Sequence, residues 1–282
     1  MKYLEEKIFK IVMVFSLFLT LAPLVLIILV SVIKGGSVLL KTPETIIQSP
    51  GPRYLLGGEG GFLHAILGSM YLVVPATIIA SLFAVTVSLF LQSDYCNKKF
   101  SNIIRILLDI LWGTPSIIFG VFILIILIFT HQRGCLMAGI AALTLLEIPI
   151  ITRYADEAIQ SVPKEIRENA YSMGLTKYET TKIVCKYSIS GIIAGILIGL
   201  GRGIGDAATV IFTTGAGSTM PGGLLQSATA LPVVIFQQAN SFYPSVRNHA
   251  YAAAFILILI ILVLNVTTRL FQKKFSKYIT GE

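Results

Sequence analysis

Charge and cysteine are both scarce in this chain of 282 residues. Charged residues make up 13% of the sequence and hydrophobic residues 55%, and the mean hydropathy is +0.83. An ordinary soluble domain carries about 25% charged residues, so this balance excludes that class. The three cysteines are odd in number and widely spaced, which predicts neither a disulfide framework nor a metal site.

A nucleotide-binding loop of the form G-x-x-x-x-G-K-[ST] is also missing from the sequence. We therefore expect neither ATP hydrolysis nor a bound cofactor in this chain. His64, His131 and His249 fall near the outer ends of predicted helices and lack the spacing of metal ligands, so we interpret them as interfacial residues.

Long apolar runs are what the sequence has in abundance. Crossing about 30 Å of hydrocarbon takes roughly 20 apolar residues. Six stretches meet or approach that length: about 11–33, 63–91, 103–130, 136–153, 188–212 and 249–271. We predict an all-α polytopic protein with six transmembrane helices, whose membrane domain, 11–271, lies between an N-terminal segment, 1–10, and a tail, 272–282. The first stretch is too long for a signal-peptide core and has no small-x-small cleavage site, so we expect it to remain.

The distribution of basic residues predicts the orientation. With the N-terminus in the cytoplasm, the inner segments carry a large excess of Lys and Arg: Lys2, Lys7, Lys10, Lys98, Lys99, Arg105, Arg153, Lys164, Arg167, Lys177, Lys182, Lys186, Arg269, Lys273, Lys274 and Lys277. This asymmetry predicts that both termini are cytoplasmic. It also accounts for the formal net charge of +8 without a nucleic-acid partner.

Three long connections separate the predicted spans. Two outer loops, about 34–62 and 214–248, are rich in Gly and Pro, and the second contains an apolar piece, Leu224–Gln238, that we interpret as re-entrant or interfacial. The cytoplasmic connection, about 156–186, is very polar. Within the third span, Trp112 to Pro115 predicts a kink because proline removes a helical hydrogen bond.

The cytoplasmic connection has the signals of a short helix with defined ends. Pro163 is favourable in a first helical turn, Ser161 is available as a cap, and Gly174 supplies the left-handed residue that ends a helix. One predicted face of this helix is apolar and consists of Ile166, Ala170 and Met173. The other face is charged and consists of Lys164, Glu165, Arg167 and Glu168.

A second helix is predicted to begin directly afterwards. Thr176 and Glu179 have the spacing of a capping box, in which each side chain accepts from the other residue's backbone N–H. Because the stop signal, the capping box and the apolar face agree, we interpret 163–174 as a docking helix for a soluble partner. A solvated loop with incidental helicity is the alternative.

Charged residues within the apolar stretches mark a second candidate site. Arg202 and Asp206 lie one helical turn apart in the fifth span, so they are expected to pair and to face protein or a pore. A four-residue stripe of glycines on the same helix predicts close packing against a neighbour: Gly191, Gly195, Gly199 and Gly203. Arg202 offers a bidentate fork to an oxyanion, and a purely structural ion pair is the alternative. Glu147 is expected to pair with Arg202 or to stay protonated, and Asp109 to reach the cytoplasmic interface.

The cytoplasmic connection resembles the EAA loop of ABC-importer permeases. Glu168, Asn169 and Ala170, followed by Gly174, match the family's Glu-Ala-Ala and Gly except at the middle position. The resemblance implies a type I importer permease whose coupling helix, Pro163–Leu175, docks on an ATPase. Its contacts to the ATPase are then expected from Pro163, Arg167, Glu168, Ala170 and Gly174.

Three further stretches are similar to phosphate permeases of the PstA type: Gly201–Ala208 with Phe212 and Thr213, Trp112–Ser116, and Ala230–Ile235. The resemblance implies one half of a phosphate pathway through Arg202 and Asp206, in a bacterial or archaeal cytoplasmic membrane. The implied partners are a PstC-like permease subunit, a cytoplasmic ATPase dimer and an extracytoplasmic phosphate-binding protein.

Other functions fit parts of the pattern. A permease of the same architecture for another oxyanion or small solute is the nearest alternative. An intramembrane enzyme would have to use Glu147, Asp109 or the histidines, which form no convergent catalytic set in the sequence. A membrane scaffold that only recruits a partner is a third alternative.

Overall fold

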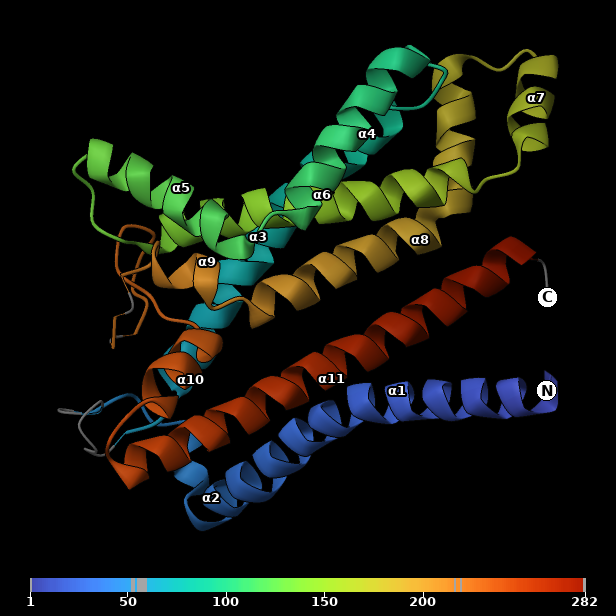
Figure 1. Cartoon of the computed structure of the whole chain (residues 1–282). Coiled ribbons are helices and arrows are strands. Elements are labelled where there is room, and N and C mark those ends of the chain that lie inside the picture. Colours follow the sequence, from blue (N-terminus) through green and yellow to red (C-terminus); the bar gives the residue numbers. More distant parts are fainter. Residues whose placement is uncertain (1, 52–53, 55–59, 216, 219, 281–282) are drawn as a thin grey trace.

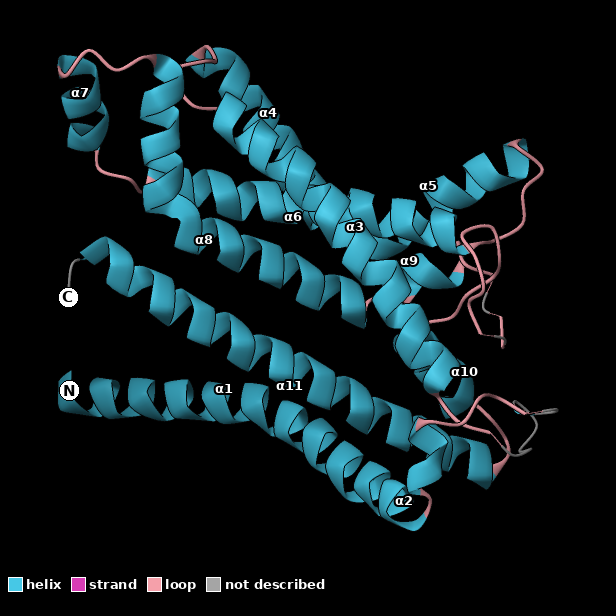
Figure 2. Ribbon diagram, turned by 180° about the vertical axis from the view of Figure 1, so that it is seen from behind, coloured by secondary structure: helices cyan, strands magenta, loops and turns pink. Residues whose placement is uncertain are grey.

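The computed structural model describes residues 2–51, 54, 60–215, 217–218 and 220–280, and every regular element in those ranges is helical (Figures 1 and 2). In chain order the helices are α1 Lys2–Val30, the π-helix η1 Ser31–Gly35, α2 Gly36–Lys41, the 3₁₀-helix η2 Pro43–Ile46, α3 Leu63–Phe90, α4 Lys98–Gly113, α5 Ser116–Phe129, α6 Leu136–Gln160, α7 Lys164–Ser172, α8 Lys177–Gly205, α9 Ala208–Ile211, α10 Leu231–Ala239 and α11 Pro244–Thr280.

Five of these helical segments are long and apolar enough to cross a membrane: Glu5–Lys41, Leu63–Phe90, Leu136–Gln160, Lys177–Gly205 and Pro244–Leu270. The pair α4 and α5 counts as a sixth only if a helix bent by 94° is taken as one span. The prediction of an all-α polytopic membrane protein is confirmed, with five or six candidate spans.

The break between α4 and α5 is sharper than the predicted kink in the third span. Thr114 adopts an extended conformation, with φ −71° and ψ 132°, because the ring of the following proline disfavours a helical residue before it. Pro115 is extended as well, with ψ 135°, and α5 starts anew at Ser116. The predicted kink is thus a complete break, and the stretch 103–130 is divided between two helices that form one span only if the bent pair is taken together.

Helices α3, α6 and α8 form the packed centre of the molecule (Figure 2). Leu72 of α3, Leu143 of α6 and Ile204 of α8 belong to one buried apolar cluster. The first and last long helices meet through η1, where Gly35 allows a close approach to Phe255.

The two connections that the sequence predicted as outer loops contain helices in the parts that the structure describes. Helical structure continues from α1 through η1 and α2 to Lys41, and η2 follows as a short helix. Of the predicted re-entrant piece, 224–238, only the part from Leu231 onward is helical, and it forms α10. Its earlier part closes the first turn of α6, because Leu136 and Met137 donate their backbone N–H groups to the carbonyl groups of Gln226 and Leu224 at 2.9 Å. These bonds satisfy donors that a helix start leaves free.

Candidate functional site

Helix α7 ends as the sequence predicts. Gly174 has a φ of +80°, which is the left-handed conformation that glycine adopts without steric cost. Its N–H donates to the carbonyl of Tyr171 at 2.9 Å, and the N–H of Leu175 donates to that of Ala170 at 3.2 Å. This pair of bonds is a Schellman motif. The predicted Ser161 cap is wrong, because that hydroxyl donates to Ala158 at 2.7 Å and so belongs to the end of α6.

The capping box at the start of α8 is confirmed. The N–H of Thr176 donates to the Glu179 carboxylate at 2.9 Å, and the Thr176 hydroxyl accepts from the Glu179 N–H at 3.4 Å. Because only Leu175 separates Gly174 from this box, the chain reverses between α7 and α8 without a flexible linker.

The faces of α7 differ in part from the prediction. Ala170 is 1% exposed and Ile166 packs against the cluster of Ile159 and Val184, so the apolar face is real. Met173 is 72% exposed, and its assignment to that face is wrong. The helix stops at Ser172, so the helical rotation that would bring Met173 inward ends one residue too early.

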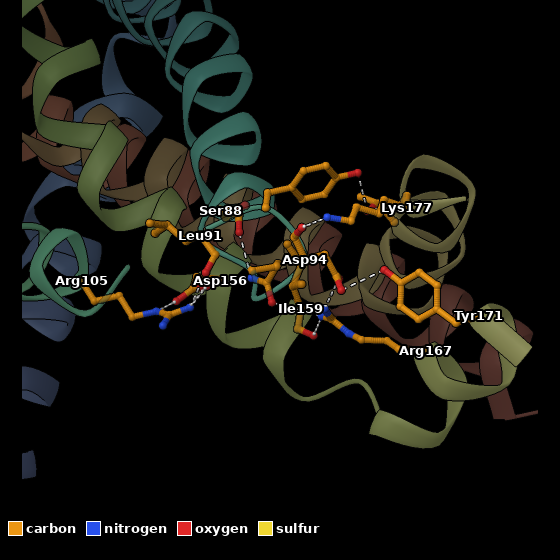
Figure 3. A network of polar contacts seen from close by, with 12 residues as sticks. Ser88, Leu91, Asp94, Arg105, Asp156, Ile159, Arg167, Tyr171 and Lys177 are labelled. Carbon is orange, nitrogen blue, oxygen red and sulfur yellow. Dashed lines mark hydrogen bonds and ion pairs between the residues drawn. The ribbon is translucent and has the colours of Figure 1, made fainter. Parts of the chain in front are cut away.

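Arg167 does not lie on the solvent face where the sequence placed it. Its guanidinium donates to the Asp94 carboxylate at 2.9 Å, to Gln92 at 3.1 Å and to the carbonyl of Ile159 at 3.4 Å (Figure 3). The side chain is 16% exposed. Because these three bonds use its donors within the chain, Arg167 fixes the orientation of α7.

Asp94, in the turn between α3 and α4, collects further contacts from the same region. The phenol of Tyr171 donates to its carboxylate at 2.9 Å, and the ammonium group of Lys177 donates to its backbone carbonyl at 3.0 Å (Figure 3). Desolvation and the bond to Asp94 raise the pKa of the Tyr171 phenol, so the phenol remains a donor at neutral pH. Asp94 thereby joins α3, α7 and α8.

The remaining loop residues point outward. Pro163, Lys164, Glu168 and Gly174 are exposed. Together with Gln92, Asp94, Gln160, Arg167 and Tyr171, Lys164 and Glu168 line a surface hollow of about 370 Å³. The predicted site residues therefore divide into an outward group, Pro163, Glu168 and Gly174, and an inward group, Arg167 and Ala170.

The glycine stripe of α8 packs against α6 as predicted. A Cβ atom added at Gly195 would lie 2.7 Å from the Cβ of Tyr154, and one added at Gly199 would lie 2.7 Å from Cγ1 of Ile151. Both distances are shorter than real carbon contacts, so the two helices lie as close as their backbones allow.

The expected ion pair between Arg202 and Asp206 is absent. Three ion pairs occur among the described residues, and they are Arg105–Asp156, Arg153–Asp109 and Arg167–Asp94. Asp206 lies outside α8, in an extended conformation, and its carboxylate accepts from the N–H of Thr209 at 2.7 Å. The helix ends at Gly205, so the i, i+4 geometry required for pairing does not form. Arg202 is exposed in the last helical turn, where a cation interacts favourably with the helix dipole.

Glu147 does not pair with Arg202 either. Its side chain is fully buried in α6, and neither carboxyl oxygen has a hydrogen-bond partner in the part of the chain that the structure describes. It lies against Gly203, on the side of α8 that faces α6. Asp109 contacts Arg153 at 3.4 Å, with both side chains substantially exposed.

The sequence did not predict three residues of this polar network, which are Gln92, Asp94 and Asp156. Asp94 and Arg167 are 73 positions apart, and no local pattern connects them. Asp156 opened the polar connection in the sequence, but it lies in the last turns of α6 and is 1% exposed. A buried acid needs a counter-charge, and the predicted inner segments contained that partner in Arg105.

Residues 84–280 match the family of binding-protein-dependent transport system inner membrane components. The chain belongs to this family. It is therefore a multi-pass inner membrane permease, the non-catalytic component of a system that also includes an ATPase and a binding protein.

Two permease relatives extend the match. The phosphate transport system permease protein PstA of Haemophilus influenzae is 34% identical over 214 residues, covering 76% of both chains. The probable PstA of Methanocaldococcus jannaschii is 30% identical over 274 residues, covering 95% of this chain and 94% of that protein. Among solved structures, the MetNI methionine ABC transporter has a TM-score of 0.62 at 16% identity, covering 79% of this chain and 97% of that one. That likeness shows the permease fold.

Proposed function

We propose that this permease is the PstA-type subunit of an ATP-driven phosphate importer and forms half of its translocation pathway. The observation that carries the proposal is the 30% identity to a probable phosphate permease along 95% of this chain. The proposed partners are a PstC-like second permease subunit, an ATPase dimer and a phosphate-binding protein.

Arg202 supports an anion as the substrate. The guanidinium is always charged, and it has no carboxylate partner among the described residues. Placing such a charge in lipid costs about 2.5–3.5 kcal/mol, so the side chain needs water, a partner or an anion. Its planar fork matches two oxygens of a phosphate group. Asp206 then shapes the turn after α8 and does not neutralise Arg202.

The outward side of α7 supports docking on the ATPase. Glu168, Pro163 and Gly174 are exposed and form the proposed contact surface, while Arg167 and Ala170 anchor the helix from below. Helix α7 lies at the same end of the molecule as the start of α1 and the end of α11, and the segment 220–230 lies at the opposite end (Figures 1 and 2). We assign the α7 end to the cytoplasm and the loop end to the binding protein.

Competition experiments test the substrate. Vesicles that contain the complete complex and its binding protein are expected to take up labelled phosphate in an ATP-dependent reaction. Excess unlabelled phosphate should abolish this uptake, whereas sulfate and methionine should leave it unchanged. Uptake that sulfate or methionine suppresses as strongly as phosphate would assign the permease to another solute.

Paired variants test the docking surface. Glu168→Ala should weaken copurification of the ATPase and lower ATP-driven uptake. Glu165→Ala is the matched control, because Glu165 is an exposed glutamate of the same helix outside the family motif. Equal copurification in both variants would remove Glu168 from the contact.

A further inference from the structure

Asp156 is a buried junction of three helices. Its carboxylate accepts from Nε and Nη2 of Arg105 on α4 at 2.7 and 3.1 Å, and from Gln160 of its own helix at 2.6 Å. A fourth bond, at 3.0 Å, comes from Gln92 just beyond α3 (Figure 3). The side chain is 1% exposed, so water contributes little to its solvation.

Gln92 connects this junction to α7. Its amide nitrogen donates to Asp156, and its amide oxygen accepts from Arg167 at 3.1 Å. The residue is 6% exposed. Only a side chain with a donor and an acceptor on one terminal group can join a carboxylate to a guanidinium in this way. An unbroken chain of polar contacts thus runs from Arg167 through Gln92 and Asp156 to Arg105.

From this chain of contacts we propose that Gln92 is a positioning residue that couples the movement of α7 to α4. The inference rests on the proposed docking of α7 to an ATPase. When the motor displaces α7, the bridge through Gln92 moves α4 with it, and the angle to α5 changes at Thr114 and Pro115. The hydrogen bonds carry the displacement because Asp156 is buried and the side chains of Arg105 and Arg167 are only 21% and 16% exposed, so that separating any pair leaves a poorly solvated group without its partner.

Helix α4 is suited to follow such a movement. Arg105 also donates to Ser101 in its own helix at 2.6 Å and to the carbonyl of Leu91 at 3.2 Å. These bonds hold its guanidinium group in place relative to α4 and to the residue that follows α3. After the C-terminal end of α4, the two extended residues at 114 and 115 interrupt the helical hydrogen bonds and provide a hinge.

The ratio of phosphate transported to ATP hydrolysed, measured on the complete complex in liposomes, tests the proposal. Gln92→Leu removes both bonds of the bridge and should lower the ratio about threefold or more, in the range that coupling networks contribute. Gln160→Leu is the control, because Gln160 donates to the same carboxylate without bonding to α7. An unchanged ratio in Gln92→Leu, or an equal loss in both variants, would overturn the proposal.

Replacing the donor of the Gln92 bridge by an acceptor provides an independent check. Gln92→Glu keeps an acceptor for Arg167 but places a second carboxylate against Asp156, so the ratio should fall. Adding Asp156→Asn restores a donor opposite the new acceptor and should recover part of the loss. If the double variant couples no better than Gln92→Glu alone, the bridge does not carry the movement.

A distance measurement separates this inference from the proposed substrate. Spin labels at Ser172 of α7 and Asn102 of α4, both exposed, should keep one distance with and without ATP in an otherwise unaltered complex. In Gln92→Leu the distance should shift or broaden on ATP binding. A distance that stays equally sharp in both complexes contradicts the coupling. Failure of phosphate uptake by the unaltered complex would instead contradict the proposed function.

Discussion

The carboxyl group of Glu147 in α6 lies directly against the backbone of Gly203 in α8. Neighbouring helical residues point about 100° apart, so with Gly203 facing α6, Arg202 points to one side of that contact. Arg202 is accordingly exposed beside this contact, and among the described residues it forms no ion pair with Glu147.

A larger residue in the glycine stripe of α8, at a position in close contact with α6, should push the two helices apart. Gly195→Ala places a methyl group 2.7 Å from the Cβ of Tyr154, which cannot turn aside. We expect a loss of about 1–3 kcal/mol in the free energy of unfolding, seen as a lower melting temperature in detergent. Gly201→Ala meets nothing within 4 Å and should be neutral or slightly stabilising. Equal melting temperatures for the two variants would contradict the packing.

Replacing the buried carboxyl of Glu147 by an amide should not harm the fold. Both oxygens lack hydrogen-bond partners among the residues that the structure describes, and an ionised carboxylate without a partner would cost several kcal/mol at this site. Glu147→Gln is therefore expected to match or exceed the melting temperature of the unaltered protein. Glu147→Lys, which introduces a buried cation, should lower it strongly. A clear loss in the Gln variant would indicate that the carboxyl group makes an essential contact.

The end of α7 depends on the positive φ of Gly174. Gly174→Ala forces a Cβ into the left-handed region, at a cost of about 1–2 kcal/mol. The bonds from the N–H groups of Gly174 and Leu175 should then open more often, and amide hydrogen exchange at Leu175 should accelerate. Gly174→Asn should have a smaller effect. Met173→Ala alters a side chain that is 72% exposed and should leave the exchange rate unchanged.

Part of this site was predictable because its signals are local. The Schellman motif at Gly174 and the capping box of Thr176 and Glu179 depend on residues within a few positions of one another. The bond between Arg167 and Asp94 joins residues 73 positions apart and depends on how α3 and α7 pack, so no local sequence pattern predicts it.

The charged residues at the end of α8 show a second limit of prediction from sequence. Arg202 and Asp206 have the spacing of a helical pair, but spacing predicts pairing only if the helix continues through both residues. Its end at Gly205 follows from the turn into α9, where the Asp206 carboxylate accepts from Thr209. The break at Thr114 and Pro115 was located by the proline, whereas its angle of 94° depends on the packing of α5.

Arg202 should be essential for transport and dispensable for folding. Arg202→Gln removes the charge and should lower phosphate uptake about tenfold or more, since a charge-assisted fork is lost. Arg202→Lys keeps the charge without the fork and should retain part of the activity. Arg247→Gln, at an exposed position on α11, is the control. Undiminished uptake in Arg202→Gln would remove this residue from the pathway.

Sided transport by the complete complex tests the central claim most directly. Liposomes are prepared with the α7 end of the permease facing outward, with the phosphate-binding protein and labelled phosphate enclosed. Adding ATP to the outside should move phosphate out of the lumen, because the ATPase then faces the medium and the binding protein faces the interior. ATP enclosed with the binding protein should move none. Phosphate movement that is independent of ATP, or that follows ATP supplied on the binding-protein side, would contradict the account.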